Sequence, residues 1–182
     1  MSTSSASNES LRLGFLTAIH LDNRGHVAGL LVTNKYGRPL EFQCTAPVRP
    51  NRAQELLYGP TLVPFLLGEL LSKTLVERIS VKPHVVLTDM SEILDSRPHV
   101  SLPVACVAAK ECSPLSPRAG RGEETGSQLV RIGKQSFWLH PEFGDDVKAF
   151  EKLAKELATD GDLLEPLERV REALQETMKA AA

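Results

Sequence analysis

The sequence has few aromatic residues and no excess of positive charge. Aromatic residues make up 5% of the 182 positions, which argues against broad surfaces for stacking bases or sugars. The formal net charge is −2, so overall charge gives no sign of a nucleic-acid coat protein or of a basic membrane-binding protein. What remains is an ordinary globular composition, with 42% apolar and 24% charged residues.

Cysteines and long apolar runs are also scarce. The three cysteines, Cys44, Cys106 and Cys112, do not have the spacing of a zinc site, and their odd number predicts free thiols in a reducing compartment. No apolar run approaches the roughly 18 residues that cross a bilayer, and the polar first ten residues do not resemble a secretory signal. We therefore expect a cytoplasmic protein without a membrane partner.

Composition divides the chain into four segments. Residues 1–10 are rich in Ser and Asn and are expected to form a disordered tail, and residues 11–110 are dense in apolar positions and are expected to form a mixed α/β domain. Residues 111–128 are rich in Pro, Gly, Ser and charge, which is typical of a flexible linker or loop. Residues 129–182 are expected to form a C-terminal extension with a short β segment and two helices.

The first half of the α/β domain reads as a three-stranded antiparallel meander. Its strands are expected at residues 13–21, 26–33 and 39–47, and glycine-containing turns separate them. His20 and His26 flank the first turn and are expected to face each other across the strands.

A helical region and a parallel strand pair are expected to follow the meander. Asn51 is a good N-cap for helical residues that continue to about residue 78. A strand at 83–88, a short helix at 91–96 and a strand at 100–108 predict a parallel pair with a right-handed crossover.

This order of elements resembles the ribonuclease H-like fold over residues 13–110. Three local matches support the resemblance: Asp22 before the glycine turn, Asn51-Arg52 at the helix start, and Thr88-Asp89 at the end of the fourth strand. The fold class is therefore expected to be α/β, with a mixed sheet. Profilin-like and roadblock-like folds also begin with a meander and a helix, but they do not predict the parallel pair at 83–108.

The resemblance implies a set of acidic residues. In that family, acids from the first strand, the first helix and the end of the fourth strand converge on two divalent metals. It implies Asp22, Glu55 and Asp89 as catalytic residues and magnesium ligands. Magnesium prefers hard oxygen ligands, and two such ions can stabilise the attacking and leaving oxygens of phosphodiester cleavage.

The sequence departs from the family pattern at two of these positions. Asp22 lies in the turn rather than inside the strand, and Gln54 holds the acidic position of the helix, one residue before Glu55. Glu69 is a competing choice further along the helical region. Each acid also has a simpler role: Asp22 in the turn, Glu55 in a first helical turn, and Asp89 as the cap of a short helix.

The C-terminal section suggests a second kind of function. Its last helix carries an apolar stripe, and the single tryptophan precedes it. These positions are candidate partner-binding residues: Trp138, Leu163, Leu167, Val170 and Leu174. The alternative is that the helix packs its stripe on the core of the protein.

Two functions from different classes follow. The main expectation is a non-catalytic binding or scaffold module of an intracellular complex, which engages a protein partner through the C-terminal section and needs no cofactor. The alternative is a divalent-metal-dependent ribonuclease H-like nuclease or nucleic-acid-processing enzyme, with magnesium as cofactor and nucleic acid as partner. The sequence does not decide whether the chain is an enzyme.

Overall fold

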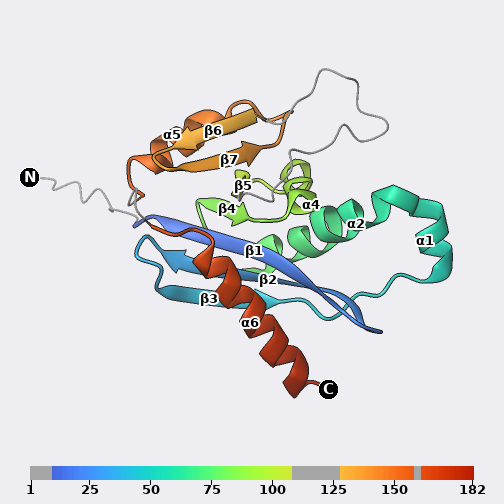
Figure 1. Cartoon of the computed structure of the whole chain (residues 1–182). Helices are drawn as coiled ribbons and strands as arrows, with labels where there is room; N and C mark the ends of the chain where they lie inside the picture. Colours follow the sequence, from blue (N-terminus) through green and yellow to red (C-terminus); the bar gives the residue numbers. More distant parts are fainter. Residues whose placement is uncertain (1–9, 108–127, 158–160) are drawn as a thin grey trace, which may run out of the picture.

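Seven strands form one mixed sheet in the order β3-β2-β1-β4-β5-β7-β6 (Figure 1). The computed structural model describes residues 10–107, 128–157 and 161–182. The predicted tail and linker lie almost entirely outside these ranges, as does Cys112. The strands are β1 (Arg12–Leu21), β2 (Gly25–Asn34), β3 (Pro39–Cys44), β4 (Val85–Thr88), β5 (Val104–Val107), β6 (Gln128–Ile132) and β7 (Gln135–Leu139).

The predicted meander is present, and a glycine fixes its first turn. β1 pairs antiparallel with β2, and β2 pairs antiparallel with β3. Gly25 has a φ of 90°, and a Cβ at this position would lie 2.1 Å from the carbonyl oxygen of Val48. A side chain at Gly25 would therefore strain the backbone and clash with the chain that leaves β3.

The strands after the meander make the sheet mixed, with both parallel and antiparallel pairs. β4 pairs in parallel with β5, as expected for the strand–helix–strand segment, and it also pairs in parallel with β1. β7 then pairs antiparallel with β5, and β6 pairs with β7. Residues 129–139 were expected within an extension, and in the structure they lie in β6 and β7, which complete the same sheet.

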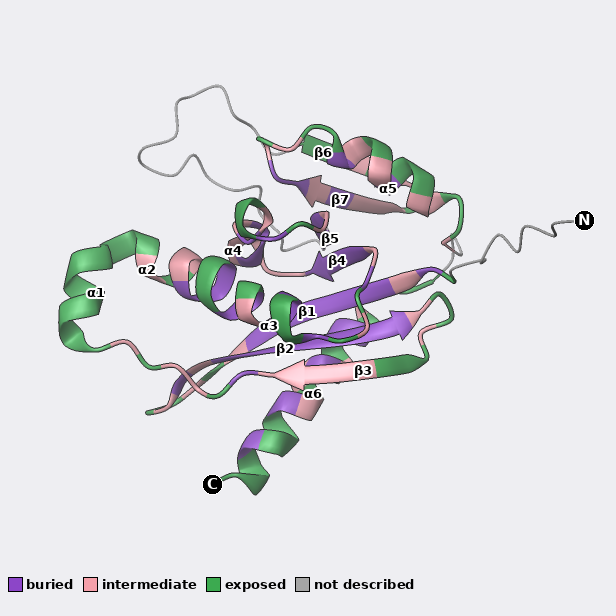
Figure 2. Ribbon diagram, turned by 180° about the vertical axis from the view of Figure 1, so that it is seen from behind, coloured by how far each residue is buried: buried purple, intermediate pink, exposed green. Residues whose placement is uncertain are grey.

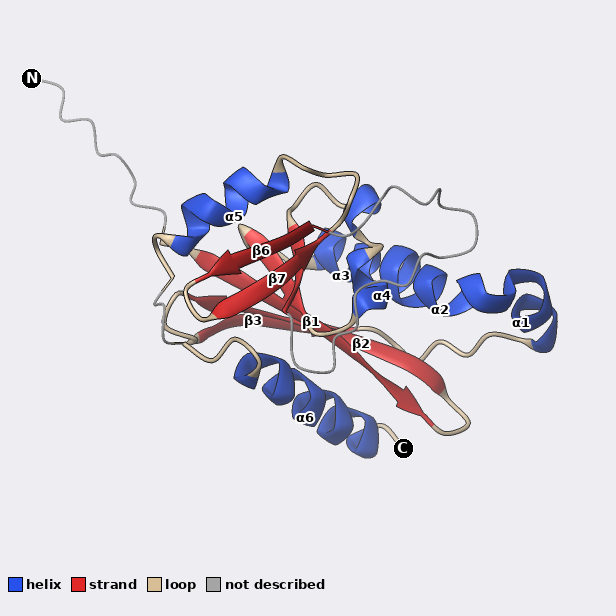
Figure 3. Ribbon diagram, turned by 45° about the horizontal axis from the view of Figure 1, so that its top comes forward, coloured by secondary structure: helices blue, strands red, loops and turns tan. Residues whose placement is uncertain are grey.

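Helices cover both faces of the sheet, which gives a three-layer arrangement (Figures 2 and 3). One face carries the helical region that begins at Asn51 and the short helix after β4, and the other carries α5 and α6. The helical elements are α1 (Arg52–Tyr58), η1 (Gly59–Thr61), α2 (Leu62–Pro64), the π-helical η2 (Phe65–Ser72), α3 (Lys73–Arg78), α4 (Ser91–Leu94), η3 (Arg97–His99), α5 (Asp146–Ala154) and α6 (Glu165–Ala180).

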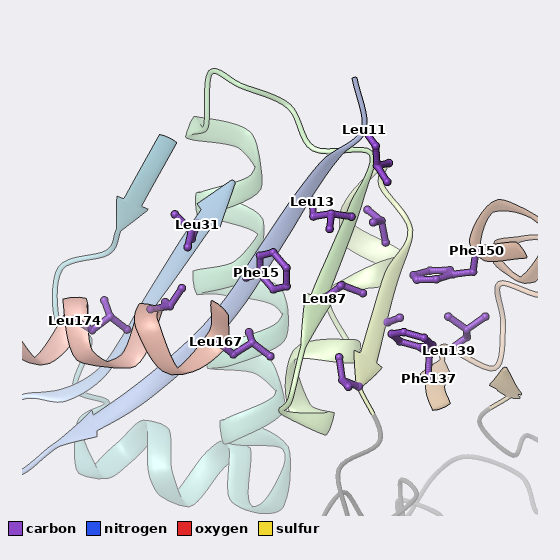
Figure 4. Close-up of a cluster of buried hydrophobic side chains, with 14 of the residues drawn as sticks. Leu11, Leu13, Phe15, Leu31, Leu87, Phe137, Leu139, Phe150, Leu167 and Leu174 are labelled. Atoms are coloured by element: carbon purple, nitrogen blue, oxygen red, sulfur yellow. The ribbon is translucent and has the colours of Figure 1, made fainter. Parts of the chain in front are cut away.

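Helix α6 packs closely on β1 and β2. Figure 4 shows Leu167 and Leu174 projecting from the helix towards Phe15 and Leu31. The approach is close because Gly29 lies under the helix: a Cβ there would be 2.9 Å from Cγ1 of Val170.

The seven-stranded mixed sheet with helices on both faces confirms the mixed α/β fold class that was predicted from the sequence.

The apolar stripe of α6 belongs to the core. Leu167, Val170 and Leu174 are each no more than 1% exposed. Leu163 is partly buried against the same core, and Trp138 is half-buried in β7. The structure therefore agrees with the alternative expectation for this helix, in which its apolar stripe packs on the core of the protein. No helix among the described residues is long and apolar enough to cross a membrane.

Candidate strand-end site

Asp89 lies directly after β4 and contacts β1. The parallel register aligns Phe15 with Leu87, so the β1 residue beside Asp89 is Thr17, two positions further on. The hydroxyl of Thr17 donates a hydrogen bond of 3.0 Å to Oδ1 of Asp89. Thr17 is fully buried, so this contact lies inside the layer between the sheet and α6.

Helix α6 supplies the second partner of Asp89. Nη2 of Arg171 forms an ion pair with Oδ2 of Asp89, and Nη1 of Arg171 lies 3.0 Å from Oε1 of Glu168. The side chain of Asp89 is 13% exposed and that of Arg171 is 26% exposed. One carboxylate oxygen of Asp89 therefore accepts from a buried hydroxyl, and the other accepts from a guanidinium.

Asp89 does not cap the short helix that follows it, although a capping role was the simpler expectation. Helix α4 begins at Ser91, and its N-cap is Met90, whose side chain makes no capping bond. The backbone N–H of Met90 donates to the hydroxyl of Thr88 instead, at 3.1 Å. Thr88 therefore shapes the turn, and Asp89 is left to face Thr17 and Arg171.

Asp22 lies away from Asp89. It follows Leu21, the last residue of β1, and is exposed in the hairpin turn. Five residues separate it from Thr17 along an extended strand, which corresponds to about 16 Å at about 3.3 Å per residue. Thr17, not Asp22, therefore holds the first-strand position beside Asp89.

Glu55 and Glu69 do not complete an acidic cluster either. Glu55 lies on α1, which has no buried residue and stands out from the body of the protein (Figure 2). Its carboxylate pairs with Arg52 at 3.1 Å, whereas that of Glu69 lies 3.9 Å from Nε2 of His99. Within the described ranges no three His, Cys, Asp or Glu side chains are grouped so that they could hold a metal ion.

The residues around Asp89 do not fit a magnesium ion. Magnesium needs near-octahedral coordination by oxygen, with carboxylates to balance its charge. Among the described residues, the strand-end position offers the carboxylate of Asp89 and the neutral hydroxyl of Thr17, with the Glu168 carboxylate on the other side of Arg171. Both carboxylates already pair with the Arg171 guanidinium. We therefore assign no metal-dependent step to Asp22, Glu55 and Asp89.

Sequence reasoning found Asp89 but missed its two partners. A signal for Thr17 was available, because it is the only polar side chain in the apolar run at residues 13–19. Strand alternation places it on the same face as Phe15. Arg171 carried no comparable signal, because its helix has charges of both signs on its other faces.

The hairpin beyond the site holds a pair of histidines, as predicted. His20 and His26 are register partners in β1 and β2, and their ring centroids are 4.7 Å apart. Burial is the larger cause that lowers the pKa of His26, and the nearby His20 lowers it further.

The lowered pKa of His26 predicts a loss of stability in mild acid. Below its ordinary pKa of about 6.5, the unfolded chain binds a proton that the folded chain still resists, so stability falls as the pH falls. In urea unfolding between about pH 7.5 and pH 5, His26→Gln should show a weaker pH dependence than wild type. His20→Gln should have a smaller effect, and identical pH profiles for wild type and His26→Gln would contradict the assignment.

No protein-family model and no curated protein sequence matches this chain. Solved structures of endonuclease V do match. The structure of Ciona intestinalis endonuclease V (D234N) in complex with an inosine-containing 23mer DNA is 12% identical, with a TM-score of 0.52, over 96% of this chain and 88% of that one. Human ENDOV is 15% identical, with a TM-score of 0.50, over 96% and 87%.

These neighbours correct the main functional expectation. A non-catalytic binding or scaffold module was expected, but the structural neighbours are nucleases, which favours the nuclease or nucleic-acid-processing alternative. Three of the residues through which a protein partner was expected to bind, Leu167, Val170 and Leu174, are also buried in the core. At these identities the likeness establishes the fold, so the chain has a mixed α/β, ribonuclease H-like fold of the kind seen in endonuclease V.

Proposed function

We propose that this chain binds nucleic acid, in a nucleic-acid-processing role. The observation that carries the proposal is the likeness to an endonuclease V solved with DNA, which extends over 96% of the chain with a TM-score of 0.52. A fold alone does not confer a function, so the proposal also needs a plausible contact surface. In open α/β sheets, ligands bind outside the carboxyl ends of the parallel strands. Here β4 ends directly before Asp89, and β1 continues past Thr17 to the β1–β2 hairpin.

Two arginines whose side chains are held in place at the β1–β2 hairpin supply groups that could contact phosphates. Arg24 and Arg49 lie at the β1–β2 hairpin, beyond the carboxyl end of β1. Arg24 donates to the carbonyl of Met178 at 3.1 Å, and Arg49 donates to the carbonyl of Asn23 at 3.0 Å. Each bond leaves further guanidinium N–H groups, and such groups bind phosphate oxygens well. With a net charge of −2, affinity must come from a local group of this kind.

Fluorescence polarisation with labelled single- and double-stranded DNA and RNA tests the proposal. In EDTA and low salt, we expect binding with Kd values of about 10⁻⁶ to 10⁻⁴ M that weakens steeply as salt is added. The variant Arg24→Ala/Arg49→Ala should bind about five- to tenfold more weakly to all probes, because phosphate contacts carry no sequence information.

Arg131→Ala is the matched control. Arg131 is exposed on β6, and β4, β5 and β7 lie between β6 and β1, so its loss should leave the affinity nearly unchanged. If none of the four probes binds at a protein concentration of about 100 μM, the weak limit of the range for non-specific binding, the proposal fails. If Arg131→Ala weakens binding as much as Arg24→Ala/Arg49→Ala does, Arg24 and Arg49 do not form the contact surface.

A further inference from the structure

Arg171 is held at the strand-end site by the packing of its helix. It follows the buried Val170 and lies one turn after the buried Leu167, both of which fix α6 against the sheet. Its guanidinium contacts Asp89 on one side and Glu168 on the other. The positive charge beside Asp89 is therefore part of the folded structure and not a feature of a loose surface side chain.

We infer that the guanidinium of Arg171 is the resident cation of this site, in the place where the ribonuclease H-like family holds a divalent metal. The guanidinium pairs with the carboxylates of both Asp89 and Glu168. A divalent ion at Asp89 would have to displace the guanidinium or lie beside it, and like charges at such short range repel strongly. If the proposed function holds, the contact with nucleic acid at the strand ends needs no divalent metal.

Thr17 supports the same conclusion from the opposite side of Asp89. The family takes an acid from the first strand, and here the β1 side chain at Asp89 is a hydroxyl that donates its proton to the carboxylate. It brings no negative charge to offset a divalent ion. Two features thus distinguish this position from a metal site. β1 places the hydroxyl of Thr17 where the family has a carboxylate, and α6 places the guanidinium of Arg171 beside Asp89.

Manganese titration of the chain alone, followed by amide NMR, tests this inference. Paramagnetic Mn²⁺ broadens the amide signals near its binding site, and no nucleic acid is needed. In wild type we expect no saturable broadening centred on Thr88 and Asp89 up to millimolar Mn²⁺. Saturable broadening there that Asp89→Asn abolishes would overturn the inference.

A second experiment tests whether a variant designed to bind metal at Asp89 does so. The variant Thr17→Asp/Arg171→Gln adds a carboxylate and removes the cation, so it should acquire saturable broadening at Asp89 below about 1 mM, since paired carboxylates are the usual magnesium-type ligands. The matched control, Thr17→Asp/Arg169→Gln, removes an arginine from the same helix but retains Arg171, and it should not acquire the site. If both variants gain it equally, Arg171 is not the residue that excludes the metal.

The wild-type titration decides the inference even if the paired variants fail to fold. It is also independent of the proposed function, because binding of nucleic acid is measured in EDTA. If the chain binds nucleic acid in EDTA and also has a manganese site at Asp89, the proposed function stands and the inference that Arg171 is the resident cation is wrong. The opposite pair of results would retain the resident cation and reject the function.

Discussion

Replacing Asp146 by alanine is expected to lower the free energy of unfolding by about 3–5 kcal/mol, because it would leave a largely buried guanidinium without its partner. Nε and Nη2 of Arg97 lie 2.6 and 2.9 Å from the two carboxylate oxygens of Asp146. The side chains are 14% and 5% exposed. Arg97 would lose a two-pronged, charge-assisted contact and keep only its bond to the carbonyl of Val100.

This pair links elements that lie on either side of residues 108–127. Arg97 is in η3, before β5, and Asp146 begins α5, after β7. The guanidinium also lies over the ring of Phe143, 4.1 Å from its centroid. Loss of the carboxylate should therefore loosen the attachment of α5 as well as remove the ion pair.

Asp145→Ala is the matched control for this prediction. Asp145 is the preceding residue, its side chain is fully exposed, and its nearest cation is Lys148 at 3.9 Å. Its replacement should change stability by no more than about 0.5 kcal/mol. Urea unfolding of both variants checks the difference, and equal losses would show that the Arg97–Asp146 pair is not the cause.

Local sequence patterns predicted most of the fold. Alternation and turn glycines indicated the meander, and the histidines at its first turn face each other as expected. Asn51 caps α1 and completes a capping box with Gln54. These features depend on residues close together in the chain, where spacing alone determines which side chains meet.

The partners of Asp89 could not be predicted in the same way. Thr17 and Arg171 are 72 and 82 residues from it in the chain. Their meeting depends on the register of β1 against β4 and on where α6 docks. Asp22 resembled the family's acid because it follows a strand, but only the paired register shows that Thr17 holds that position. The pairing of β7 with β5 also joins residues that are distant in the chain, about 30 positions apart, so a hydrophobic pattern could not reveal it.

An amphipathic helix also has the same pattern whether its stripe meets a partner or its own core. In α6 the deciding fact is that the stripe contacts β1 and β2, which no spacing within residues 165–180 can show. Mutation can separate the two readings directly. A docking stripe would tolerate truncation without loss of stability, and a core stripe would not.

Leu167→Ala is accordingly expected to cost about 2–5 kcal/mol, the range for removing a fully buried leucine side chain. Leu167 is 0% exposed and packs in the cluster that includes Phe15 and Leu87. The matched control is Leu57→Ala on α1, where the side chain is 85% exposed and the change should stay within about 0.5 kcal/mol. The urea midpoint should fall for Leu167→Ala with little change in the m-value.

The same pair of variants also tests how the core supports the site. If packing of α6 holds Arg171 against Asp89, Leu167→Ala should shift the amide signals of Thr17 and Asp89 in the folded state, whereas Leu57→Ala should leave them in place. A large loss of stability without such shifts would mean that the ion pair persists when the helix loosens. Shifts together with the loss would show that the residue which fills the core also positions the resident cation.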